Sequence, residues 1–236
     1  MRPWQHRAPQ MSDSLLTVAC LTVSGGFQDA YTFYVRGQVF ANAQTGNIVL
    51  FSEHLFRGDW AVMLRYLVPV MAFALGVWAA ERVRVRYRHL RRVHWRQWIV
   101  LLEIAILAAV GLMPETLNAA ANAMISFACA MQVQAFRKVN GSAVASTMCI
   151  GNLRSMMETW DAYLRTRDRA LLRTALRYLA VLSCFALGAG LGSVLAPLLG
   201  TRAIWVSCAW LVAGFALMAV RDRREASPPP DAEKGA

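Results

Sequence analysis

The stretch DAYTFYVRGQVFANAQTGNIVL, residues 29–50, places a helix breaker and hydrogen-bonding side chains inside sequence that otherwise resembles a membrane-spanning helix. The interruption is Thr45-Gly46-Asn47. Glycine permits a break in a helix, and asparagine can cap the backbone groups that the break frees. Irregular backbone at membrane depth is tolerated only where protein or a wet cavity surrounds it. Residues 39–56 are therefore predicted to dip into the membrane without crossing it, or to lie along it.

The rest of the chain is equally apolar. Of its 236 residues, 57% are hydrophobic, and the mean hydropathy is +0.36, which is too apolar for an ordinary soluble domain. The apolar runs are continuous rather than alternating, which favours helices over membrane strands. Six windows come close to the ~20 residues that a helix needs to cross the hydrocarbon. These windows are 14–35, 61–80, 98–113, 119–136, 175–199 and 203–220.

The positive charge of the chain, +11 net, lies in loops and termini rather than in one patch. Membrane-flanking arginines explain it without a nucleic-acid partner. Arginines crowd the link 82–96, the link 137–174 and the tail that begins at residue 221, so all three are expected in the cytoplasm. Six crossings with both termini inside satisfy this distribution, whereas eight crossings would put the 82–96 loop or both basic termini outside. Residues 1–13 are then a cytoplasmic segment and 221–236 a disordered cytoplasmic tail.

A weaker copy of the opening stretch occurs later in the chain. A shift of 105 residues aligns residues 29–50 with QAFRKVNGSAVASTMCIGNLRS, residues 134–155, so that Gly46-Asn47 meets Gly151-Asn152. Residues 143–160 therefore predict a second broken segment. Each half holds three crossings, an odd number, so the second half should be inverted relative to the first.

The predicted fold is all-α: a polytopic membrane protein with six transmembrane helices, two broken or re-entrant segments and a 3+3 inverted-topology repeat. Repeat 1 covers 14–113 and repeat 2 covers 119–220. Small residues recur every fourth position in two of the windows, which indicates stripes on which helices approach closely; composition bias is the alternative. The stripes are Ala72, Gly76 and Ala80, and Cys184, Gly188, Gly192 and Ala196.

Asp29 is an acidic residue within the first window. A carboxylate in hydrocarbon costs about 2.5–3.5 kcal/mol on insertion scales, so it should face protein or water. One interpretation makes Asp29 a proton or cation site, or a ligand for a polar substrate. The other makes it a structural carboxylate that caps the broken segment or pairs with Arg36.

The two Gly-Asn breaks supply the remaining candidate site residues, because broken-helix ends can bind small ions or polar ligands. A break satisfied within the protein, with no ligand, is the equal alternative, and for the neighbouring amides and hydroxyls a helix-to-helix hydrogen bond is the alternative. With Asp29, the predicted substrate-binding set is Gln28, Thr45, Gly46, Asn47, Gln132, Gln134, Thr147, Gly151 and Asn152.

Other titratable residues are assigned no site. Glu103 is expected at the inner interface, where it snorkels or pairs with Arg92 or Arg96. His54 has no second ligand at useful spacing, and the five cysteines lack CxxC pairs, so neither a metal nor a cofactor is predicted. No recognisable catalytic motif occurs, which argues against an enzyme and leaves the catalytic set empty.

The two signatures resemble those of the YoaK family, bacterial multi-pass membrane proteins without an established activity. Gly26, Asp29-Ala30, Val39-Phe40 and Thr45-Gly46-Asn47 match the first signature. Gln132, Ala135, Thr147 and Gly151-Asn152 match the second more loosely, with Ile150 in place of the threonine. The resemblance implies a six-span protein of the bacterial inner membrane and no particular substrate.

The leading functional hypothesis is a secondary transporter or permease for a small polar solute or ion. Its expected partners are the lipid bilayer and that solute, with a second copy of the chain left open. The alternative is a non-transport scaffold or sensor whose basic cytoplasmic loop engages anionic lipid.

Overall fold

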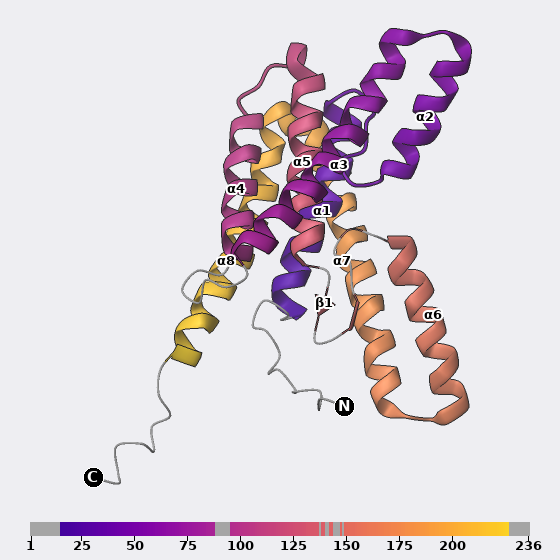
Figure 1. The fold of residues 1–236 in the computed structure, drawn as a ribbon, viewed down its shortest axis with the longest axis vertical. Helices are drawn as coiled ribbons and strands as arrows, with labels where there is room; N and C mark the ends of the chain where they lie inside the picture. The colour runs from indigo at the N-terminus through magenta and orange to yellow at the C-terminus, as the bar shows by residue number, and fades with distance from the viewer. Residues whose placement is uncertain are drawn as a thin grey trace.

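The computed structural model describes residues 15–87, 95–136, 138–139, 142–143, 147 and 149–226, and this part of the chain is almost entirely helical (Figure 1). The α-helices are α1 (Leu15–Val35), α2 (Gln44–Arg57), α3 (Trp60–Tyr87), α4 (Trp95–Val110), α5 (Asn118–Ala135), α6 (Cys149–Thr166), α7 (Arg169–Leu199) and α8 (Ile204–Ala226). Short 3-10 turns η2 (Glu115–Leu117) and η3 (Gly200–Ala203) precede α5 and α8. Two-residue strands β1 (Lys138–Val139) and β2 (Ser142–Ala143) pair antiparallel. The prediction of an all-α fold is confirmed.

Each predicted window overlaps one helix, namely α1, α3, α4, α5, α7 and α8, although α3 ends seven residues after its window and α7 begins six residues before its window. The two Gly-Asn motifs fall in the first turns of the other two helices, α2 and α6. Helix α8 continues to Ala226, beyond the expected end of the last window at residue 220. The predicted N-terminal segment 1–13, residues 88–94 of the 82–96 arginine loop and residues 227–236 of the tail lie outside the described residues, as do residues 144–146 and 148 of the predicted segment 143–160. Residues 82–87 of that loop belong to α3.

Two helical stretches are long and apolar enough to cross a membrane, as judged from length and composition. They are Trp60–Arg86, within α3, and Arg169–Val220, which contains both α7 and α8. At 1.5 Å per residue, the 28 residues of α3 and the 31 of α7 extend roughly 42 and 46 Å. Large apolar side chains such as Met71 and Leu187 are exposed along the outer faces of these helices.

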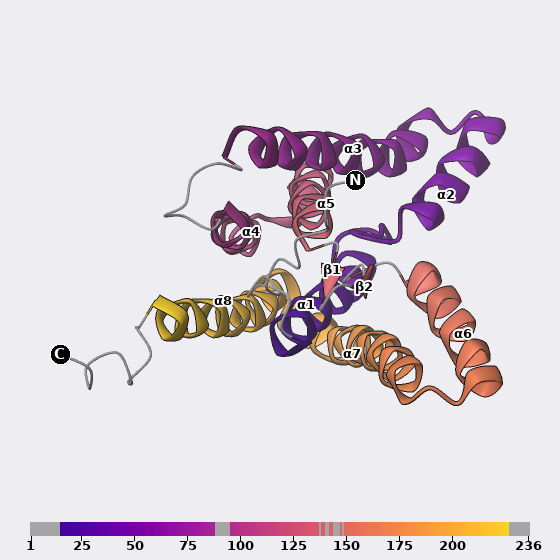
Figure 2. The same cartoon turned by 60° about the horizontal axis from the view of Figure 1, so that its bottom comes forward.

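The helices pack in a reciprocal pattern (Figure 2). Helix α1 lies against α7 and α8, while α5 lies against α3 and α4. Helix α2 packs beside α3, α6 packs beside α7, and α4 meets α8. The first helix of each half of the chain is thus held mainly by the helices of the other half.

Two of the glycines that allow close helix contacts are Gly188 and Gly76. A Cβ atom at Gly188 of α7 would overlap the backbone carbonyl of Val23 in α1, and one at Gly76 of α3 would overlap the carbonyl of Phe127 in α5. Backbones this close are possible only where no side chain intervenes. The predicted packing role of the small-residue stripes is confirmed at these positions.

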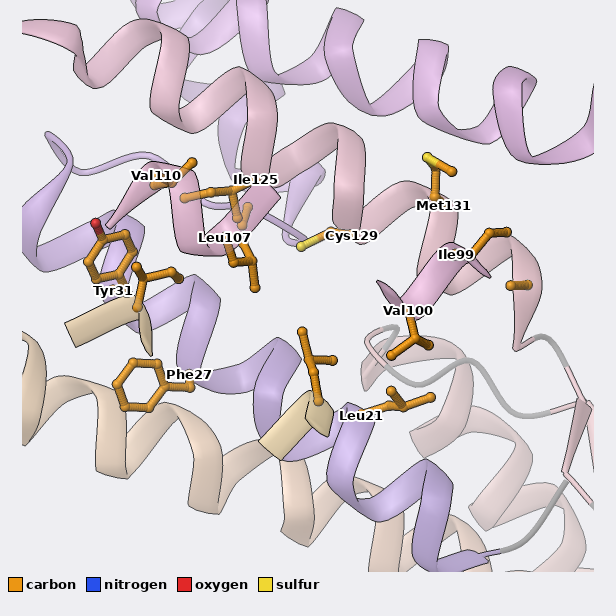
Figure 3. Packing of buried hydrophobic residues seen from close by; sticks show 14 of the residues in the cluster. Leu21, Phe27, Tyr31, Ile99, Val100, Leu107, Val110, Ile125, Cys129 and Met131 are labelled. Atoms are coloured by element: carbon orange, nitrogen blue, oxygen red, sulfur yellow. The ribbon is translucent and has the colours of Figure 1, made fainter. Parts of the chain in front are cut away.

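The hydrophobic centre is built by side chains from α1, α4 and α5 (Figure 3). Phe27, Leu107 and Ile125 represent the three helices there, and all are fully buried. The same interior holds many buried polar side chains, whereas large apolar ones cover the outside. Buried polar groups are the exception in soluble proteins, so their number in this interior is unusual.

Candidate functional site

A cluster of buried polar side chains lies between α1, α4, α5 and α8, centred on Gln28. The Nε2 atom of Gln28 donates to Ser24 Oγ at 2.9 Å, to Glu103 Oε1 at 3.1 Å and to Ser207 Oγ at 3.2 Å. The thiol of Cys129 donates to its Oε1 at 2.7 Å. We call these five residues and Gln132 the central polar cluster. It joins side chains from four helices that are distant in sequence.

Glu103 is the acidic member of the central polar cluster. It lies midway along α4, between Trp95 and Val110, and its side chain is only 1% exposed. The amide of Gln132 approaches its two carboxyl oxygens to 2.9 and 2.8 Å. The expectation that Glu103 snorkels to the inner interface is therefore wrong: α1, α5 and α8 enclose it.

Asp29, the neighbour of Gln28, points to a different place. Its Oδ1 accepts a hydrogen bond of 2.6 Å from the backbone N–H of Asn42, and the N–H groups of Ala41 and Ala43 also interact with the carboxylate. Asp29 is 6% exposed. The carboxylate thus satisfies backbone donors in the chain that leads into α2, as the capping interpretation describes.

The first Gly-Asn break is held by Asn47. Its Oδ1 accepts from the backbone N–H of Phe40 at 3.0 Å, and its Nδ2 donates to the carbonyl of Phe40 at 2.7 Å and to Gln44 Oε1 at 3.0 Å. A Cβ at Gly46 would lie 2.9 Å from the Phe40 ring, so glycine lets this ring pack against α2. Thr45 is exposed.

The second Gly-Asn break is built differently. Asn152 is buried, but a Cβ atom added at Gly151 would meet no described atom within 4 Å. Thr147, the described residue just before α6, is buried against Gly25 of α1. Cys149, at the start of α6, is close enough to Asp29 for an electrostatic interaction. Among the described residues of the second copy, Thr147 thus contacts the helix that carries Asp29, and Cys149 interacts with Asp29 itself.

Helices α2 and α6 start next to each other and run in opposite directions, as both overall views show (Figures 1 and 2). Asn42, before α2, donates from Nδ2 to the carbonyl of Gly25 at 3.2 Å. Thr147, before α6, contacts the same Gly25. We call Gly25, Asp29, Asn42 and Thr147 the helix-start cluster. Asn42 also interacts with the Cys129 thiol, which relates the helix-start cluster to the central polar cluster.

The predicted site residues therefore fall into separate groups. Gln28 and Gln132 belong to the central polar cluster, and Asp29 and Thr147 to the helix-start cluster. Gln134 lies apart, donating to Glu81 Oε2 at 2.7 Å near the end of α3. The sequence interpretation missed Glu103, although the rule that singled out Asp29, an acid within an apolar helix, applies to it equally.

Arg36 does not pair with Asp29. Its Nε donates to the Tyr31 hydroxyl at 2.8 Å, and its Nη2 donates to the carbonyls of Val110 and Met113 at 2.8 and 3.0 Å. Its Nη1 donates to Pro114 O and Asn118 Oδ1 at 3.2 and 3.0 Å. All five N–H donors of the guanidinium are used. Arg36 is therefore a cross-link between α1 and the end of α4, where carbonyl groups favour a cation.

A cavity of about 390 Å³ lies beside Arg36, between the end of α1 and the starts of α3 and α5. Arg65 and Glu115 line it, together with Asn122. Asn122 is fully buried and donates to the carbonyl of Arg36 at 2.8 Å. Its Oδ1 has no hydrogen-bond partner among the described residues. We call this space the α1–α5 cavity.

The chain was compared with known protein families, curated proteins and solved structures. The model of the family described as "Protein of unknown function (DUF1275)" matches residues 17–217. No curated protein and no solved structure matches the chain. The family description names no activity and does not carry the YoaK name.

Proposed function

Because the chain belongs to the DUF1275 family, whose function is unknown, its activity must be argued from the site, and we propose that it is a secondary transporter or permease for a small polar solute or ion. In this proposal the protein lies in the bacterial inner membrane, crosses it six times and has both termini in the cytoplasm. Its substrate site lies between the two halves, where α2 and α6 start.

The distribution of side chains supports a membrane location. Exposed apolar residues follow one face of α3 at helical spacing, including Leu64, Met71 and Leu75, and α7 exposes Leu187 and Val194. Contiguous apolar surface of this kind is unfavourable in water and favourable in lipid. Polar and charged side chains within the apolar helices, such as Gln28, Asp29 and Glu103, face the interior, as they do in membrane proteins that handle polar solutes.

The proposed inverted repeat is supported by the spacing and packing of the helices. Helix α2 begins at Gln44 and α6 at Cys149, 105 residues later, which is the shift that aligns the two signatures. The packing of α1 on α7 has its counterpart in that of α5 on α3. Inverted repeats of this kind, with broken helices at their interface, recur in secondary transporters.

The observation that carries the proposal is the convergence of both broken segments on Gly25. Asn42, just before α2, and Thr147, just before α6, both contact Gly25. The Asp29 carboxylate lies one turn further along α1 and interacts with Cys149 of α6. A relative movement of the two halves would separate Asn42 from Thr147. Such a movement is what alternating access around a site between repeats requires.

The test is a flux screen of small polar solutes and ions in proteoliposomes. The variants Asp29→Asn and Asn47→Ala should lower the flux severalfold, because each loosens the backbone that forms the start of α2. Ser52→Ala is the matched control, since Ser52 lies on α2 and its hydroxyl donates to the carbonyl of Ile48 at 2.9 Å, one turn earlier on the same helix. A solute flux that neither Asp29→Asn nor Asn47→Ala changes would show that the proposed site is wrong.

A second candidate function is the membrane scaffold or sensor. The observation that favours it is that Asp29 and Asn47 form hydrogen bonds with backbone groups of the protein itself, as expected of side chains with a purely structural role. Exposed Arg82 and Arg86 at the end of α3 would then engage anionic lipid. This function predicts no solute flux and a retention of anionic lipid that Arg82→Gln with Arg86→Gln abolishes.

A further inference from the structure

We propose that Glu103 is a proton-binding site, loaded and unloaded from the α1–α5 cavity along the face of α5 that carries Asn122, Ser126 and Cys129. This proposal deepens the proposed function by naming H⁺ as the coupling ion, and it rests on that function only for the coupling, not for proton binding. Loading forms one O–H bond on the Glu103 carboxylate with a proton taken from water in the cavity. Unloading returns the proton to that water.

The first argument is that the Glu103 carboxyl group has no cationic partner in the part of the chain that the structure describes. Among the described residues, no arginine or lysine forms an ion pair with it. Arg96, on the same helix, lies seven residues earlier, about 10 Å along the axis, with its guanidinium over the rings of Trp95 and Phe136. A buried carboxyl group without a cation is costly when ionised and can become neutral by taking up a proton.

The groups that face Glu103 from its neighbouring helices are also uncharged or acidic. Cys129 of α5 interacts electrostatically with both Glu103 and Asp29, and Cys208 of α8 interacts with Glu103. From α3, the acidic Glu81 forms an ion pair with Arg84 of its own helix. Because these described neighbours supply no positive charge, a proton is the positive charge that can neutralise the Glu103 carboxylate.

The second argument is that Gln132 can bond to Glu103 in both protonation states. The Gln132 amide lies against both carboxyl oxygens of Glu103, and either end of an amide group can be turned toward such a partner. An amide oxygen facing two carboxyl oxygens requires a proton between them, which the neutral acid supplies. With the amide turned over, its nitrogen donates to both oxygens of the ionised group, at 2.9 and 2.8 Å.

The third argument is a line of polar atoms between the α1–α5 cavity and the central polar cluster. Asn122, Ser126 and Cys129 follow one another at positions i, i+4 and i+7 and so share one face of α5. Asn122 Oδ1 and Ser126 Oγ are buried without a hydrogen-bond partner among the described residues, and Asn122 lines the cavity. Buried polar atoms normally have a partner.

The line ends at Glu103. The thiol of Cys129 bonds to Gln28 Oε1 at 2.7 Å, and Gln28 Nε2 bonds to Glu103 Oε1 at 3.1 Å. The unpartnered oxygens of Asn122 and Ser126 can accept hydrogen bonds from water, or from protons that move between the cavity and the Glu103 carboxyl group. The face thus connects a solvent-sized space to the buried acid.

The test is infrared difference spectroscopy of the purified full-length protein between acid and alkaline pH, without any substrate. We expect a carboxylic-acid C=O band that Glu103→Gln removes and Asp29→Asn leaves in place. Glu103→Gln keeps the shape and the Gln28 hydrogen bond, and its folding is checked by size-exclusion chromatography and thermal unfolding. A titrating band that survives in folded Glu103→Gln, or the absence of such a band in the unsubstituted protein, overturns the proposal.

The route is tested by the rate at which the same band appears after a rapid drop in pH. Ser126→Ala should slow it severalfold, and Ser193→Ala, which removes an exposed α7 hydroxyl, should not. Equal rates in all three proteins overturn the route. Because these spectra need no flux, a band without any solute flux defeats the transport proposal alone, and a flux without the band defeats the proton site alone.

Discussion

The carboxylate of Asp29 and the backbone N–H of Asn42 are joined by a hydrogen bond of 2.6 Å, which ties the second half of α1 to the chain that enters α2. Asn42 in turn donates to the carbonyl of Gly25, one turn earlier on α1. The irregular residues between α1 and α2 are therefore anchored twice on the helix that precedes them. The break after α1 is a fixed structure in which a buried acid supplies the acceptor.

Replacing Asp29 should show how much its carboxylate contributes to the stability of the protein. Asp29→Ala leaves the backbone donors of residues 41–43 without an acceptor, and we expect a loss of about 1–3 kcal/mol in the free energy of unfolding. Asp29→Asn keeps one acceptor oxygen and should lose less. Denaturant unfolding in detergent measures both, with the exposed Asp161→Asn as control. Equal stability of Asp29→Ala and Asp161→Asn would contradict the capping role.

Asn47→Ala removes the side chain that bonds to both backbone groups of Phe40. Because those groups lose their partners at the start of α2, we expect a loss of about 1–3 kcal/mol. Thr45→Ala, two residues away on an exposed position, should change stability by less than about 0.5 kcal/mol. Thermal unfolding of the two variants side by side gives the comparison. The account of the break would be wrong if Thr45→Ala were the more damaging of the two.

Gly188 and Gly190 offer a matched pair on α7. A Cβ at Gly188 overlaps the Val23 carbonyl, whereas one at Gly190 meets nothing within 4 Å. Gly188→Ala should therefore cost about 1–3 kcal/mol through overpacking. Gly190→Ala should be neutral or stabilise by up to about 1 kcal/mol, because alanine favours a helix over glycine. Similar melting temperatures for both variants would argue against the close α1–α7 contact.

Arg36→Lys should destabilise the protein although the charge is kept. An ammonium group has three donors and cannot reproduce the five-bond contact of the guanidinium with α4, Tyr31 and Asn118. Leaving buried acceptors unpaired costs about 1–3 kcal/mol each, so we expect a loss of at least about 2 kcal/mol. Arg65→Lys is the control, since Arg65 is exposed and no hydrogen bond or ion pair to it occurs among the described residues. A tolerated Arg36→Lys would mean that its charge, not its geometry, matters.

Much of the helix layout follows from the sequence because the signals are local. Continuous apolar windows mark six of the helices, and Gly46-Asn47 and Gly151-Asn152 mark the starts of the other two. The small-residue stripe around Gly188 also correctly predicts a close helix contact there, since close packing of two helices needs a small residue at the contact itself.

The arrangement of the site follows less well because it depends on contacts between distant segments. The burial of Glu103 is created by α1, α5 and α8, and its partners Gln28 and Gln132 lie 75 residues before it and 29 after it. The partners of Arg36 come from the end of α4 and from α5. Hydropathy along the chain registers none of these contacts. It places an isolated acid in a helix without showing which helices surround that acid.

The central claim, that the two broken segments belong to halves of opposite orientation, is tested most directly by cysteine labelling in intact cells. Arg57 near the end of α2 and Arg165 near the end of α6 are matched positions, both exposed and each in an i,i+4 ion pair. In a background without the native cysteines, a membrane-impermeant maleimide added from the periplasm should label Arg57→Cys and leave Arg165→Cys unlabelled until the cells are opened. Labelling of both positions from the periplasm, or of Arg165→Cys alone, would contradict the account.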